Sequence, residues 1–233
     1  MISLRQFTFD IRKITAQRHL WVVVLMCVIA GAYSSSNFDL LRASYVKRWG
    51  VASEPKFNAW RSLISSGAGT TDLERLKKVN EFINREVAFG NDEQVWGQAN
   101  YWATPLETIG RSAGDCEDYA IAKYFSLLQV GIAPEKLRLI YVRVKTGTSD
   151  NNLIQAHMVL AYYAQPEAEP LVLDNLIGDI RLASRRPDLV PVFSFNHNGV
   201  FTGISGKEAS PAAGTERLSR WADLLKRARE EGF

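Results

Sequence analysis

The chain has 233 residues, of which 46% are hydrophobic and 23% are charged, and its net charge is +3. This length suits one domain with a real hydrophobic core, and the sequence holds no repeat, low-complexity tract or long linker. It also has no basic stripe with interleaved aromatic side chains, so we expect no nucleic acid partner.

The first 32 residues have the pattern of an export signal. Basic side chains precede an apolar run at residues 20–32, which ends in Ala-Gly-Ala. The run is shorter than the ~20 residues of a membrane span, so we expect cleavage, with an uncleaved anchor as the alternative. The excess positive charge lies in this segment, and the rest of the chain is near neutral. We predict that residues 1–32 are a signal peptide and that residues 33–233 form one domain outside the cytoplasm.

The first half of this domain is predicted to be helical. Residues 38–49 and 55–64 are short amphipathic runs, and the sequence Thr71-Asp72-Leu73-Glu74 is a capping box that opens a third helix. A polar stretch at residues 90–100 is expected to be irregular. The sequence Thr104-Pro105-Leu106-Glu107 then opens a further short helix, with Pro at its first position.

A helix over residues 116–130 is expected to be central. After its first turn only Lys123, Ser126 and Gln129 are polar, and a helix that is apolar almost all round is buried on most sides. Gly131 suits the end of this helix.

The second half of the domain is predicted to contain strands. Alternating or β-rich runs lie at residues 137–145, 154–163, 170–176 and 190–195, with a short piece at 199–203. An amphipathic helix at residues 215–229 follows. Helices first and strands second indicate an α+β fold, with an antiparallel sheet packed on the central helix.

Cys116 stands at the start of that central helix, while the other cysteine, Cys27, lies in the leader. An unpaired thiol in an exported protein is either a nucleophile or a buried structural residue. A helix N-terminus favours a thiolate, but the carboxylates of Asp115, Glu117 and Asp118 oppose it. We therefore expect a bound cation to neutralise them.

A histidine and an aspartate lie on neighbouring predicted strands. If residues 164–167 form the turn, His157 and Asp174 lie directly opposite each other, with Cβ atoms ~4.5–5.5 Å apart. A His oriented by a carboxylate near a thiol has the logic of a catalytic triad. The alternative is that His157 is a structural strand residue, and a register slip of one residue would separate the two side chains.

These residues resemble a known family. The decapeptide at residues 115–124 (DCEDYAIAKY), followed by a strand His and a strand Asp, is similar to the bacterial transglutaminase-like cysteine proteinases. The segment YWATPLE at residues 101–107 belongs to the same resemblance. It implies a papain/transglutaminase-like fold in which Cys116 is the nucleophile, His157 the general base and acid, and Asp174 the residue that orients it.

The resemblance also implies a cofactor and partners. The family is calcium-dependent, so Asp115, Glu117 and Asp118 are expected to bind Ca²⁺. The implied function is a periplasmic endopeptidase that cuts the N-terminal region of a large biofilm adhesin at a di-alanine site. An inner-membrane receptor that senses cyclic di-GMP is expected to hold it inactive. An acyltransferase and a non-catalytic calcium-responsive binding module remain alternatives, and a homodimer stays open.

Overall fold

The computed structural model describes residues 38–146, 153–197, 199–202 and 215–233. The predicted signal peptide at residues 1–32 lies outside these ranges. Within them, no helix is both long and apolar enough to cross a membrane.

The first half is helical, as predicted. Both capping boxes form: Thr71 accepts from the backbone of Glu74, and Thr104 does the same for Glu107, with each glutamate returning a bond. Residues 38–49 are helical. The other elements are η1 (Val51–Ser53), α2 (Glu54–Ser65), α3 (Asp72–Glu86), α4 (Asp92–Trp96), α5 (Pro105–Arg111) and α6 (Cys116–Gln129).

Helix α4 falls in the stretch 90–100 that we expected to be irregular, so that expectation was wrong in part. The side chain of Asn91 accepts a hydrogen bond from the backbone of Gln94 at 3.0 Å and caps the helix. Gly97 ends it in the left-handed conformation, at φ 70°. Cap and terminator lie only six residues apart, too close for an apolar periodicity to show in the sequence.

The second half forms a six-stranded antiparallel sheet in the order β6-β5-β4-β3-β7-β8. A small parallel pair, β1 and β2, lies apart from it beside the start of α6. The strands are β1 (Ala88–Phe89), β2 (Ala113–Gly114), β3 (Leu137–Thr146), β4 (Leu153–Tyr162), β5 (Leu171–Leu173), β6 (Arg181–Leu182), β7 (Leu189–Asn196) and β8 (Gly199–Thr202). The remaining elements are η2 (Pro134–Lys136), η3 (Ala183–Arg185) and α7 (Thr215–Glu231).

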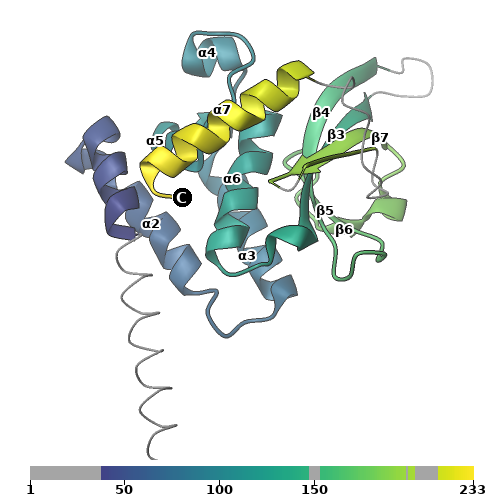
Figure 1. Ribbon diagram of the computed structural model, residues 1–233, viewed down its shortest axis with the longest axis horizontal. Coiled ribbons are helices and arrows are strands. Elements are labelled where there is room, and N and C mark those ends of the chain that lie inside the picture. Colours follow the sequence, from purple (N-terminus) through teal and green to yellow (C-terminus); the bar gives the residue numbers. More distant parts are fainter. Residues whose placement is uncertain (1–37, 147–152, 198, 203–214) are drawn as a thin grey trace, which may run out of the picture.

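Helix α6 is central, as predicted. It lies between the other helices and the sheet, and α7 crosses it (Figure 1). Two members of its predicted polar stripe are buried: Ser126 accepts a hydrogen bond from the indole of Trp60 at 2.9 Å, and Lys123 is fully enclosed. The third, Gln129, is half-buried. Burial lowers the pKa of Lys123 to about 7, although Asp174 acts in the opposite direction.

The two faces of the sheet have different surroundings because side chains alternate along a strand. One face packs in the main core with α6, through Leu139, Leu160, Leu173, Phe193 and Phe195. The other face carries a second apolar cluster formed by Ile140, Val142, Val159, Ala161, Tyr163 and Val172. Either face of the sheet could therefore carry a functional site.

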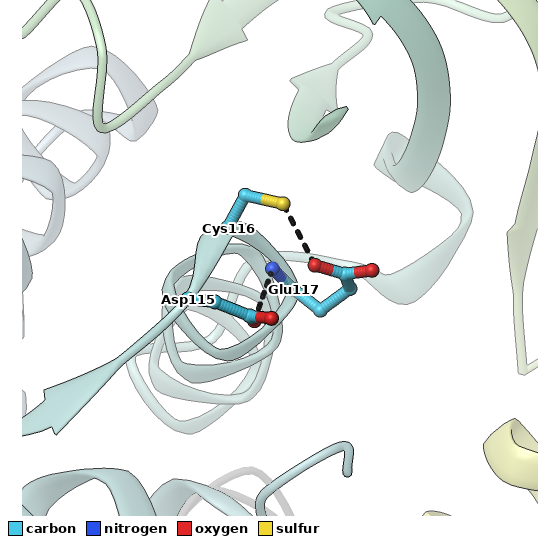
Figure 2. A group of neighbouring side chains, drawn as sticks. All are labelled: Asp115, Cys116 and Glu117. Atoms are coloured by element: carbon cyan, nitrogen blue, oxygen red, sulfur yellow. Dashed lines mark hydrogen bonds between the residues drawn. The ribbon is translucent and has the colours of Figure 1, made fainter. Parts of the chain in front are cut away.

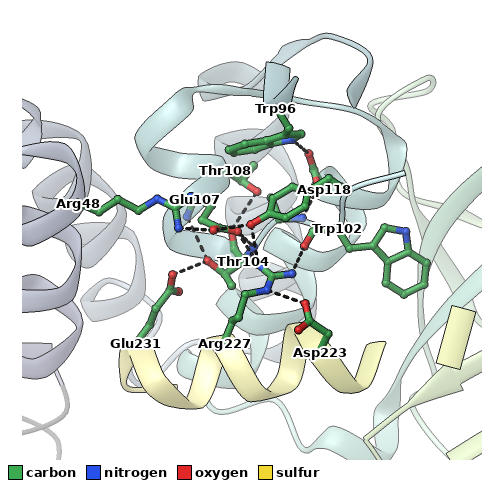
Figure 3. A network of polar contacts seen from close by, with 12 residues as sticks. Arg48, Trp96, Trp102, Thr104, Glu107, Thr108, Asp118, Asp223, Arg227 and Glu231 are labelled. Atoms are coloured by element: carbon green, nitrogen blue, oxygen red, sulfur yellow. Dashed lines mark hydrogen bonds and ion pairs between the residues drawn. The ribbon is translucent and has the colours of Figure 1, made fainter. Parts of the chain in front are cut away.

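A buried carboxylate joins distant parts of the helical half. Glu107 in α5 forms ion pairs with Arg48 and, at 2.8 Å, with Arg227 of α7 (Figure 3). It also accepts from the hydroxyl of Tyr101 at 2.7 Å, and Arg227 donates to the backbone oxygen of Trp102 at 2.7 Å. This network fixes the segment between α4 and α5, which borders the N-terminus of α6.

Candidate active site

Cys116 is the first residue of α6, and Asp115 alone separates it from the end of β2. The carboxylate of Asp115 caps the helix by accepting from the backbone amides of Glu117 at 3.1 Å and Asp118 at 3.5 Å. Glycine is required at position 114, because a Cβ there would lie 2.5 Å from Oδ2 of Asp118. The local sequence therefore determines where the thiol stands (Figure 2).

The thiol contacts both a carboxylate and the sheet. Sγ of Cys116 donates to Oε2 of Glu117 at 2.7 Å, as Figure 2 shows. The backbone amide of Met158 lies close enough to the sulfur to favour its thiolate form. Met158 follows His157 in β4, so the thiol lies against the strand that carries the predicted base. Burial, together with the charges of Glu117 and Asp115, raises the pKa of the thiol well above its ordinary value, and the Met158 amide only partly offsets this.

His157 and Asp174 are paired. Nε2 of His157 lies 2.8 Å from Oδ1 of Asp174, and both side chains are buried. Asp174 also accepts from the guanidinium of Arg186 at 2.7 Å and from the backbone of Leu176 at 3.1 Å. Burial would raise the pKa of Asp174, but the bonds from His157 and Arg186 outweigh it and hold the pKa at about 2. The contact with Asp174 holds Nε2 of the imidazole, so Nδ1 is the ring nitrogen that could accept or donate a proton.

The predicted strand register was wrong. Leu160 pairs with Leu173 and Tyr162 with Leu171, a shift of two residues from the register that would set His157 opposite Asp174. The connection between the strands spans residues 163–170 rather than 164–167, because β4 ends at Tyr162 and β5 begins only at Leu171. A shift by an even number keeps the side chains on one face, so the two groups still meet.

The residues around the thiol form an acidic cluster. Ligand atoms of Asp115, Cys116 and Glu117 lie within 4.8 Å of one another, and those of Asp92, Asp115 and Asp118 do the same. Burial and then the neighbouring carboxylates raise the pKa of Asp115 to about 9, and burial raises that of Asp92 to about 6. Carboxylate oxygens held this closely suit a hard cation.

Asp92, in the first turn of α4, was missed by the sequence analysis. Its Oδ2 accepts from the backbone amide of Tyr101 at 2.8 Å, and its buried Oδ1 has no hydrogen-bond partner in the described part of the chain. A buried carboxylate oxygen without a donor fits the coordination of a metal ion. Asp92 lies more than 20 residues before Asp115, so the local pattern gave no signal for it.

The chain is similar to a family of known proteins. The family model described as "Bacterial transglutaminase-like cysteine proteinase BTLCP" matches residues 61–188, more than half of the chain. The chain belongs to the bacterial transglutaminase-like cysteine proteinases. A search of curated proteins gives no match.

Solved structures of this cysteine proteinase family are also similar. Legionella pneumophila LapG has 36% identity and a TM-score of 0.66, and the match covers 82% of this chain and 96% of LapG. The calcium-bound form of the same protein has 38% identity and a TM-score of 0.67, with 80% and 96% covered. An EGTA-treated form matches as well, at 36% identity, a TM-score of 0.66, and 82% and 96% covered. These likenesses confirm the predicted α+β, LapG-like transglutaminase/papain-like fold.

Asp118 has a structural position in this cysteine proteinase. Its Oδ2 accepts from the indole of Trp96 at 3.1 Å and its Oδ1 from the backbone of Ala103 at 2.8 Å, so it joins α6 to the end of α4 and to the segment after it (Figure 3). Burial raises its pKa to about 7. Its predicted role as a metal ligand stays a prediction, and its two bonds to neutral donors leave it less free than Asp92.

Proposed function

We propose that this chain is a cysteine endopeptidase in which Cys116, His157 and Asp174 act as nucleophile, general base and orienting residue. One observation carries the proposal: the thiol at the start of α6 lies against β4, the strand on which His157 is held by Asp174 at 2.8 Å. A base oriented by a buried carboxylate next to a helix-terminal thiol is the arrangement that nucleophilic acyl transfer needs.

The proposed reaction has two steps. Nδ1 of His157 takes the proton from the Cys116 thiol, and the sulfur attacks the scissile carbonyl. The imidazolium then gives its proton to the leaving amine, and a thioester remains. In the second step His157 takes a proton from water, whose oxygen attacks the thioester and releases the acid and the thiol. The backbone amide of Cys116 is at the first turn of α6, where helix N–H groups lack intrahelical partners, and we propose it as an oxyanion donor.

Calcium is the cation that we propose for the acidic cluster. Asp115, Glu117 and Asp92 would hold it, with Asp118 as a further ligand or a support. The ion would supply positive charge beside the thiol, where three carboxylates otherwise oppose a thiolate. The fit is supported by the donor type, by the spacing within 4.8 Å and by the buried Oδ1 of Asp92.

On its resemblance to the family, we propose a periplasmic location and a large biofilm adhesin as substrate. Cleavage would fall at a di-alanine site in the N-terminal region of the adhesin. An inner-membrane receptor that senses cyclic di-GMP would hold the protease inactive. The similarity to LapG over four-fifths of the chain supports this set of proposals.

A cleavage assay tests the enzymatic proposal. The chain is incubated with the N-terminal region of an adhesin, with calcium or with chelator, beside the variants Cys116→Ser, His157→Gln and Asp174→Asn. Asp179→Asn is a matched control, because Asp179 is an exposed carboxylate in the same loop as Asp174. We expect discrete products only with calcium and an intact Cys116. Cleavage by Cys116→Ser at the wild-type rate would refute the proposal, and incorporation of a labelled amine in place of new termini would favour acyl transfer.

Calorimetric titration with CaCl₂ tests the cation proposal separately. Asp115→Asn, Glu117→Gln and Asp92→Asn should each weaken binding at least about tenfold, since each removes a charged ligand. Glu93→Gln is the matched control, because Glu93 also lies in the first turn of α4 but is not part of the cluster. Full activity in chelator, or an unchanged affinity in Asp115→Asn, would contradict a calcium site here.

A further inference from the structure

The face of the sheet that points away from α6 holds a half-open pocket of about 350 Å³. Strands β3, β4, β5 and β7 form its floor, and the segment around η3 forms its wall. Most of the lining is apolar, including Ile140, Val142, Val159, Val172, Leu189 and Pro191. This volume falls within the range of small-molecule sites, ~300–1,000 Å³. Cys116 packs in the main core on the other face of the sheet, and neither His157 nor Asp174 lines the pocket, so the proposed reaction makes no direct use of it.

A buried donor stands in the wall of this pocket. Arg186 is only 2% exposed, and its Nη1 has no hydrogen-bond partner among the residues that the structure describes. A buried N–H without an acceptor costs free energy, so a ligand that brings an acceptor would be favoured. This donor gives an otherwise mostly apolar pocket a polar group that a ligand could bind.

The charges around Arg186 determine which acceptor is suitable. Its Nη2 already pairs with Asp174 at 2.7 Å and with Asp188 at 2.8 Å, and Glu169 lines the same pocket. The positive charge is therefore compensated, and an anionic ligand would be repelled by three carboxylates. A neutral carbonyl or hydroxyl group can accept from Nη1 without that penalty.

We propose that this pocket binds a small neutral molecule with an apolar body and one hydrogen-bond acceptor, and that binding is coupled to the catalytic pair through Arg186. Nη2 of Arg186 donates to Oδ2 of Asp174, whose Oδ1 pairs with Nε2 of His157. Only these two contacts separate the pocket wall from the imidazole. The coupling rests on the proposed function, whereas the binding site does not.

Ligand-observed NMR with heptan-2-one as the probe tests the site, and heptanoate is the anionic comparison. We expect saturable binding of the ketone, at least about tenfold tighter than that of heptanoate, because the carboxylates around Arg186 repel the anion. Ala183→Trp fills the pocket and should abolish binding. Leu182→Trp is the matched control, since Leu182 is adjacent but does not line the pocket. Equal binding of the two probes, or binding unaffected by Ala183→Trp, would overturn the site.

The ring resonances of His157 give the second readout. Saturation with heptan-2-one should shift them in the wild type and in Leu182→Trp, and should leave them unmoved in Ala183→Trp. Arg186→Lys keeps a positive charge but removes the guanidinium fork, and should weaken ketone binding at least about tenfold, because the hydrogen bond to Nη1 is lost. A His157 resonance that stays unmoved at saturation would overturn the coupling. Neither readout needs protease activity, so a failed cleavage assay leaves both results interpretable.

Discussion

Replacement of Asp174 by asparagine should change how folding stability depends on pH. Asp174 is buried and holds both His157 and Arg186. An asparagine keeps one acceptor oxygen but turns an amide NH₂ toward one of these donors and removes the negative charge. Breaking a buried ion pair from one side costs ~3–5 kcal/mol, so we expect the variant to be destabilised by about that amount near pH 6.

The pH dependence has a definite sign and size. The folded-state pKa of Asp174 is about 2, below the ordinary value of 3.8, so this carboxylate stabilises the fold above pH 4. At ~1.4 kcal/mol per pKa unit the contribution is about 2.5 kcal/mol, and about 2 kcal/mol of it is lost as the pH falls from 6 to 2. Asp174→Asn has no such group to titrate. The stability advantage of the wild type over the variant should therefore shrink by about 2 kcal/mol across this range.

Urea unfolding measures this difference. The unfolding is followed by far-UV circular dichroism in chelator, at steps from pH 6 to pH 2. Carboxylates elsewhere titrate in both proteins and cancel when the two curves are subtracted. Asp179→Asn removes an exposed carboxylate from the same loop and controls for the loss of one negative charge. Parallel stability curves for the wild type and Asp174→Asn would refute the inference that His157 and Arg186 hold Asp174 ionised.

Three further outcomes are expected. Glu107→Gln should lower the free energy of unfolding by about 3–5 kcal/mol, because two arginines lose a buried partner, whereas Glu54→Gln at an exposed pair should cost below about 1 kcal/mol in the same denaturation assay. Gly114→Ala should cost about 1–3 kcal/mol by thermal melting, since its Cβ would overlap Asp118, and an unchanged melting temperature would contradict the close approach. Calcium at 100 times its Kd should stabilise the wild type by about 2.7 kcal/mol relative to chelator, and at the same concentration Asp92→Asn should keep at most about 1.4 kcal/mol of this stabilisation.

Local features of the fold could be predicted from the sequence. The two capping boxes act within four residues, so Thr71 and Thr104 identified the starts of α3 and α5 correctly. The apolar run after Cys116 predicted the central helix, because burial on all sides follows from the side chains of the helix itself. The order of helices and strands then predicted the α+β class.

Features that depend on distant contacts could not be predicted in this way. The register of β4 and β5 depends on where two strands end, and the composition of residues 163–170 did not determine this. The shift was even, so the pairing of His157 with Asp174 survived an incorrect register. Asp92 joined the acidic cluster only through folding of the segment between α4 and α5, a contact that no short pattern records.

That segment shows how the acidic cluster is held in place. The backbone amide of Tyr101 binds Asp92, and the backbone amide of Ala103 binds Asp118, so the same short stretch fixes two members of the cluster. The stretch is itself held from the other side, where the Tyr101 hydroxyl donates to Glu107 and the Trp102 carbonyl accepts from Arg227. These outer groups are not members of the cluster. The positions of its carboxylates are therefore set by the fold, and a cation that binds them would meet ligands already in place, so little of its binding free energy would be spent on ordering the site.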